Sequence, residues 1–150
     1  MPERWFETYR GMVLPQECDD FGHLNIAHYV AKFDVANNHI YARIGLSTSV
    51  RRQLGLACVA AENAIRYRSE LRSGDVLVAR SLIVGFHDPL IHFMTELRKV
   101  EDTVVSATFE EIACCFDLTT RSSTAFPEHV GREIAKLIAP AAEPLVLRIR

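Results

Sequence analysis

The segment ECDDFGHLN, residues 17–25, gathers three carboxylates, a thiol, an imidazole and an amide around one glycine. Carboxylates and imidazoles serve as general bases, and carboxylates and thiolates serve as nucleophiles. Gly22 lets the backbone turn sharply and approach a ligand closely. These residue types favour an active-site loop over a plain turn, although spacing alone leaves Asp19 equally open to being a solvated turn acid.

The elements on either side of this segment predict a strand-to-helix corner. Residues 6–14 have the pattern of a strand that Pro15 ends. Asn25 suits a helix N-cap, and the apolar residues behind it keep helical spacing until Gly45, which is typical of a helix end. A helix with so wide an apolar surface should be buried along most of its length.

Alternating apolar residues rich in Val, Ile, Phe and Thr predict four further strands, at 57–68, 75–86, 90–100 and 103–118. Between the helix and these strands, STSVRRQLG (residues 47–55) is expected to be a polar connection. A short helix is predicted at about 127–138, opened by Pro127, whereas residues 139–150 match no pattern.

Short turns between consecutive strands should make those strands antiparallel neighbours. One antiparallel sheet curved around one central helix is the compact arrangement, which places the chain in the α+β class. Two alternatives are a barrel and a ferredoxin-like sandwich. The sandwich needs a second interior helix, which the sequence pattern does not contain. All 150 residues are expected to form a single domain.

The composition is ordinary for a globular protein, with 49% hydrophobic residues, 24% charged residues and a net charge of −2. This balance gives no reason to expect nucleic acid or a membrane as a partner. No apolar run approaches the roughly 20 residues of a membrane span, and no apolar signal segment is visible at the start. The four cysteines lack CxxC or zinc-like spacing, so we expect free thiols, no metal and a cytoplasmic location.

Two motifs resemble those of the hot-dog fold thioesterases, in the branch of 4-hydroxybenzoyl-CoA thioesterase. ECDDFGHLNIAHYVAKFDVA, residues 17–36, is similar to the branch's acidic–x–Asp–x–x–Gly–(His)–x–Asn–x–x–x–Tyr pattern. IRYRSELRSGD, residues 65–75, resembles its Y-x-x-x-x-x-x-G-D segment. The resemblance implies a hot-dog fold, acyl-CoA or acyl-carrier thioester substrates, and no dissociable cofactor. It also implies a homodimer or dimer of dimers with active sites at the subunit interface.

The resemblance assigns Asp19 as the general base or the nucleophile. It assigns the backbone N–H of Ile26 to polarise the thioester carbonyl, with help from the helix dipole. His23 is the third candidate catalytic residue, which either hydrogen-bonds the substrate or steadies the loop. Cys18 is a rival nucleophile, but neighbouring carboxylates raise the pKa of a thiol, so packing as a small hydrophobe is expected. Glu17 and Asp20 are expected to be solvated loop charges.

Residues expected to contact the substrate lie at the helix start and in the strand 57–68: Gly22, Asn25, Tyr29 and Glu62. Asn25 is expected mainly to cap the helix, and Tyr29 is expected mainly to pack. Glu62 either faces an interface pocket or is solvated at a sheet edge. Three arginines are candidates for the CoA phosphates, with plain surface exposure as the alternative: Arg66, Arg68 and Arg72.

Two other functions compete with thioester hydrolysis. A hot-dog dehydratase or hydratase needs a histidine and an acid for proton transfer, and only His23 lies in the motif. A non-catalytic acyl-CoA-binding dimer is the second competitor. Whichever function the protein has, the strand 57–68, with its apolar LACVAA, should pair with its symmetry mate in a homodimer, because an exposed apolar edge invites aggregation. The acyl group is left open by the sequence.

Overall fold

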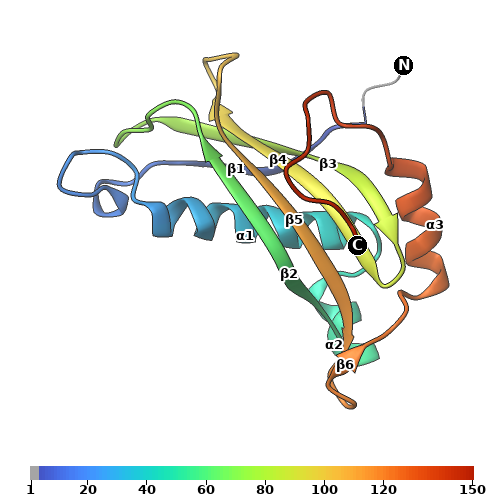
Figure 1. The fold of residues 1–150 in the computed structure, drawn as a ribbon. Helices are drawn as coiled ribbons and strands as arrows, with labels where there is room; N and C mark the ends of the chain where they lie inside the picture. The colour runs from blue at the N-terminus through green and yellow to red at the C-terminus, as the bar shows by residue number, and fades with distance from the viewer. Residues whose placement is uncertain (1–3) are drawn as a thin grey trace.

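A computed structural model describes residues 4–150 and contains a curled antiparallel sheet with one long helix across its concave face (Figure 1). The elements are β1 (Phe6–Met12), η1 (Pro15–Glu17), α1 (Ile26–Arg43), α2 (Thr48–Leu54), β2 (Leu56–Tyr67), β3 (Val76–His87), β4 (Leu90–Lys99), β5 (Val105–Asp117), β6 (Ser122–Ser123) and α3 (Glu128–Leu137). The predicted α+β class and hot-dog arrangement are confirmed.

The order of strands in the sheet is β1-β3-β4-β5-β2, with the short β6 added to β5. The expectation that all consecutive strands are neighbours is wrong for β2 and β3, because β2 pairs antiparallel with β5, from Leu56↔Asp117 to Tyr67↔Ala107. The connection 68–75 therefore crosses one end of the sheet. Its length permits this, since three strand spacings are only about 14 Å and extended chain covers about 3.3 Å per residue.

Helix α1 buries one face against the sheet and exposes the other. On the buried face Phe33 stacks on Phe109 of β5 at 4.9 Å between ring centroids. Three apolar residues of α1 remain exposed in the single chain: Ile26 at 61%, Val30 at 48% and Val35 at 46%. Burial along most of the length of α1 is therefore found, from Tyr29 to Tyr41, but on one face only.

Residues 47–55 contain the helix α2 and not an irregular connection. The Ser47 side chain accepts from the Val50 N–H at its start, and Gly55 ends it in the left-handed region at φ +67°. The segment has no apolar stripe to reveal a helix, so its two caps were the available signal. The predicted C-terminal helix is confirmed as α3, which packs Val130 and Ile134 into the core.

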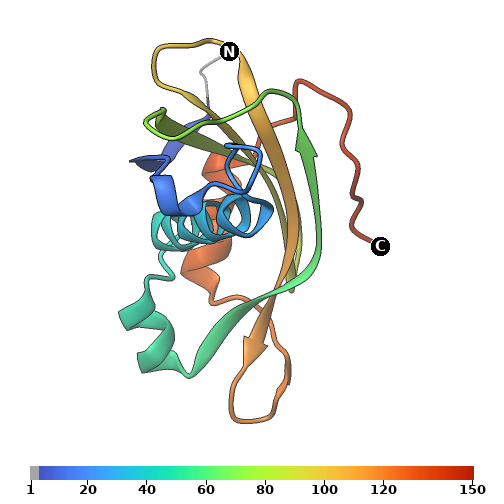
Figure 2. The same cartoon turned by 90° about the vertical axis from the view of Figure 1, so that its left-hand side faces the viewer.

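The C-terminal segment 139–150, which no sequence pattern placed, lies on the convex side of the sheet, away from α1 (Figures 1 and 2). Within residues 4–150, none of the helices is both long and apolar enough to cross a bilayer.

Candidate functional site

The segment 17–25 forms the predicted corner between β1 and α1. A backbone bridge joins Cys18 to Leu24, and between them Gly22 adopts φ +81° while its N–H donates to the Asp19 carbonyl at 3.0 Å. The Asn25 side chain accepts from the Ala27 N–H at 2.9 Å and so caps the helix that starts at Ile26. The predicted turn at Gly22 and cap at Asn25 are confirmed.

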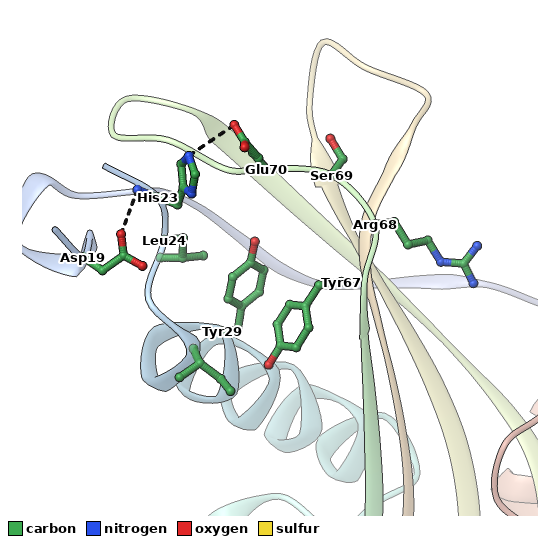
Figure 3. Close-up of a pocket in the computed structure, with 9 residues that line it drawn as sticks. Asp19, His23, Leu24, Tyr29, Tyr67, Arg68, Ser69 and Glu70 are labelled. Carbon is green, nitrogen blue, oxygen red and sulfur yellow. Dashed lines mark hydrogen bonds and ion pairs between the residues drawn. The ribbon is translucent and has the colours of Figure 1, made fainter. Parts of the chain in front are cut away.

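Asp19 is held in place by the loop that it begins. Its Oδ1 accepts from the backbone N–H of Phe21 at 2.9 Å and of His23 at 3.3 Å. Its Oδ2 makes no hydrogen bond to any residue between 4 and 150. One carboxylate oxygen is thus fixed by backbone donors, and the other is available to a water molecule or a substrate (Figure 3).

The first amide of α1 is also available. Asn25 occupies the N–H of Ala27, but the Ile26 N–H has no partner in the described part of the chain. This amide lies at the positive end of an 18-residue helix, where the dipole favours negative charge. Ile26 lines the same cavity as Asp19, a space of about 490 Å³ lined by Asp19, His23, Leu24, Ile26, Tyr29, Tyr67, Arg68, Ser69 and Glu70.

The crossing connection 68–75 forms the opposite wall of this cavity. The Leu24 N–H donates to the Leu71 carbonyl at 2.8 Å, and His23 and Arg72 form a backbone bridge. The His23 Nε2 lies 3.3 Å from the Glu70 carboxylate and 3.2 Å from the Arg72 guanidinium, which donates to Glu70 at 2.9 Å. The hydrogen bond from Arg72, helped by His23, lowers the pKa of Glu70.

Two tyrosines form the floor of the cavity, between α1 and β2. Tyr29 is 6% exposed, and its ring meets that of Tyr67 edge to face, with centroids 5.0 Å apart. Burial raises the pKa of the Tyr29 hydroxyl, which keeps it a neutral donor. Tyr67 and Glu70 were not among the predicted site residues, although Tyr67 is the tyrosine of the second motif.

The structure brings some of the predicted site residues together and separates others. The candidates that line the cavity are Asp19, His23, Ile26, Tyr29 and Arg68. Glu62 is exposed in the middle of β2, beside a bulge, and does not line the cavity. Arg66 pairs in register with Thr108, on the face of β2 opposite to Tyr67.

Two neighbours of Asp19 have different environments. Glu17 is not the solvated charge that was expected, because it pairs with the buried Lys32 ammonium at 2.9 Å and accepts from the Leu14 N–H at 2.8 Å. Burial raises the pKa of Glu17, but these two donors outweigh it, and the pKa lies below its ordinary value. Cys18 packs against the core. Throughout residues 4–150, no three His, Cys, Asp or Glu side chains are grouped as a metal site requires.

A buried acid that the sequence did not reveal lies under the C-terminal half of α1. Glu111 of β5 is 4% exposed and accepts from the Tyr41 hydroxyl at 3.3 Å and from the Asn37 amide at 3.2 Å. Burial raises its pKa to about 7, against the effect of these two donors. The Asn37 Oδ1 is buried and has no partner in the described chain.

We expect Glu111→Gln to stabilise the fold at pH 8 and to have little effect at pH 4.5. Because the folded-state pKa of about 7 exceeds the ordinary 4.5, stability falls as the pH rises between these values. The loss in the free energy of unfolding reaches on the order of 3 kcal/mol at pH 8, or roughly 6–12 °C in Tm. Thermal melts of both forms at pH 4.5 and pH 8 measure this difference, and Glu101→Gln, in an exposed turn, is the control. Equal effects of Glu111→Gln at both pH values would show that Glu111 is not protonated on folding.

The fold and the cavity define a hot-dog protein with a carboxylate and a helix N-terminus at one site. Residues 13–134 match the sequence pattern of the thioesterase-like superfamily. This match covers most of the chain, which therefore belongs to that superfamily.

Individual relatives are 28–30% identical to this chain over the residues that align. The Staphylococcus aureus protein SAV2348, solved in complex with CoA, superposes with a TM-score of 0.85 at 28% identity, over 97% of this chain and 95% of that one. Protein THEM6 of Xenopus laevis is 30% identical over 67% of this chain and 48% of its own length. The betainyl-CoA thioesterase of Pseudomonas aeruginosa is 29% identical over 57% of this chain and 54% of its own. The chain thus spans about half the length of the curated relatives that it matches.

Proposed function

We propose that this protein is an acyl-CoA thioesterase, which hydrolyses a thioester to a free acid and CoA. The observation that carries the proposal is that Asp19 and Ile26 line one cavity, and that within residues 4–150 one Asp19 oxygen and the Ile26 N–H have no partner. Thioester hydrolysis needs such a pair, a base or nucleophile and a donor for the developing oxyanion. Superfamily membership and the CoA-bound relative support the same reaction.

The reaction has two forms that this site can perform. With Asp19 as a base, its carboxylate takes a proton from a water molecule while the water oxygen attacks the thioester carbon. The Ile26 N–H stabilises the oxyanion that forms. The C–S bond then breaks, and the CoA thiolate takes up the proton from Asp19. With Asp19 as a nucleophile, its carboxylate oxygen attacks the thioester carbon, the C–S bond breaks, and CoA leaves as a thiolate from the mixed anhydride that forms. Water hydrolyses the anhydride in a second step, which frees the acid, restores the Asp19 carboxylate and supplies the proton that the thiolate takes up.

His23 has a positioning role in this account. Its Nε2 faces Glu70 and Arg72, and its backbone N–H holds Asp19. His23 therefore ties the crossing connection to the Asp19 loop. Beside the Asp19 loop, the apolar surface for the acyl group comes from Tyr29, Tyr67 and Leu24.

Two of the three candidate arginines lie at the cavity and are expected to contact the phosphates of CoA: Arg68, which lines it, and Arg72. Arg72 is exposed at the rim of the cavity, beside Glu70 and His23, which both line it. We expect Arg72→Ala to raise KM for acyl-CoA by about tenfold and to leave kcat nearly unchanged, because nucleotide contacts exist in ground and transition states alike. Arg66→Ala, on the other face of β2, is the control. An equal loss with acyl-pantetheine, which lacks the nucleotide, would refute the phosphate contact.

The competing functions are separated by the products. A thioesterase releases free CoA from saturated acyl-CoAs, a hydratase adds water to an enoyl-CoA without releasing CoA, and a binding protein does neither. We therefore expect CoA release on a panel of aromatic, short-chain, branched and charged acyl-CoAs, and the preferred member identifies the acyl group.

A further inference from the structure

The C-terminal segment 139–150 is anchored to the convex face of the sheet by a buried acid. Glu110 of β5 is 4% exposed, and its carboxylate accepts from the backbone N–H groups of Val146 at 2.7 Å and Leu147 at 2.9 Å. The buried His92 lies 3.3 Å from the same carboxylate. The Ala139 N–H further donates to the Ile83 carbonyl at 2.9 Å. A carboxylate that receives backbone donors from a segment fixes its path, so this segment has a defined place.

This path brings Glu143 to Arg68. The Glu143 carboxylate accepts from the Arg68 guanidinium at 2.6 Å, and the two side chains are 43% and 36% exposed. Arg68 is one of the residues that line the cavity. In Figure 3 its guanidinium extends away from Asp19, His23 and the tyrosines. The C-terminal segment thus holds a cationic side chain of the cavity rim on the outside of the sheet.

A glutamate carboxylate and a phosphate are alternative partners for one guanidinium, because both present paired oxygens to its planar donors. We propose that Glu143 competes with the phosphates of the CoA substrate for Arg68, and so sets the affinity of the cavity for phosphorylated thioester carriers. This inference rests on the proposed function. The competition is modest and reversible, since an exposed ion pair is easily exchanged.

The test is CoA binding by isothermal titration calorimetry to the full chain and four variants. Removing the competitor in Glu143→Ala should tighten the Kd for CoA by roughly 2–5-fold, in line with the strength of exposed ion pairs. Pantetheine, which has no phosphate, should bind the variant and the wild type equally. Glu133→Ala is the matched control, because Glu133 is 41% exposed and pairs with Lys136 on α3. It should leave the Kd unchanged.

The double variant Glu143→Ala/Arg68→Ala decides whether Arg68 carries the effect. It should bind CoA no more tightly than Arg68→Ala. A gain that persists without Arg68, or no gain in Glu143→Ala while the wild type binds CoA, would overturn the competition. If no form of the protein binds CoA, the proposed function fails instead, so the two failures are distinguishable. Higher salt should shrink the gain, because exposed charges are screened.

Discussion

Asp19→Asn should lower kcat for acyl-CoA hydrolysis by about 10²–10⁴-fold, the usual cost of a lost general base. Asparagine retains an oxygen for the N–H groups of Phe21 and His23, so the loop keeps its shape. It lacks the carboxylate oxygen that faces the cavity. Substrate binding should survive, because the acyl surface and the helix N-terminus are unchanged. Single-turnover hydrolysis and CoA titration measure the two effects separately.

The matched control for this prediction is Cys18→Ser. The Cys18 thiol packs against the core beside the loop, so its replacement should retain most activity. Hydrolysis in ¹⁸O-labelled water then distinguishes the two forms of the mechanism: label in the Asp19 carboxylate means a nucleophile, and label only in the released acid means a base. Near-normal turnover by Asp19→Asn together with an inactive Cys18→Ser would transfer the chemistry to the thiol.

The second large effect concerns assembly. β2 is an edge strand of twelve residues that pairs with β5 on one side only, and Val59 on it is 37% exposed. Because an exposed strand edge invites pairing, this edge is expected to join its symmetry mate in a homodimer. Antiparallel pairing of two β2 strands would bring the α2 end of one copy toward the Tyr67 end of the other. The cavity would then gain a wall from the partner.

Ala61→Lys tests this arrangement, because it places a charge on each copy in the middle of the expected seam. Ala61 has no residue in register on β5, so the change should leave the fold intact. We expect a monomer by analytical ultracentrifugation and a loss in kcat/KM on the order of 10²-fold, since catalysis is sensitive to small displacements. Ala135→Lys, exposed on α3, should remain dimeric and active. A wild-type protein that is monomeric and fully active would exclude the interface.

Local chemistry explains which parts of the site the sequence could predict. The cap at Asn25, the turn at Gly22 and the start of α1 each depend on a few adjacent residues, and each was found in its predicted place. The cap of α2 at Ser47 was just as local, but without an apolar stripe it gave too weak a signal. Short-range signals therefore placed the corner that carries Asp19.

Long-range contacts explain what was missed. The position of β2 beside β5 is decided by packing across the whole sheet, and it alone makes 68–75 a crossing connection. That crossing brings Glu70 to His23, residues far apart in the chain. The Glu17–Lys32 pair and the hold of Glu110 on the C-terminal segment have the same origin. No periodicity reports which charged side chains will meet.

Release of free CoA by the purified wild-type protein and by Asp19→Asn, on one panel of acyl-CoAs, tests the central claim most directly. The account predicts multiple turnovers with at least one acyl-CoA for the wild type, and a rate lower by about 10²–10⁴-fold for the variant on that same substrate. It also predicts that both forms bind CoA with similar affinity. CoA binding without release on any member of the panel, or equal release by the two forms, would contradict it.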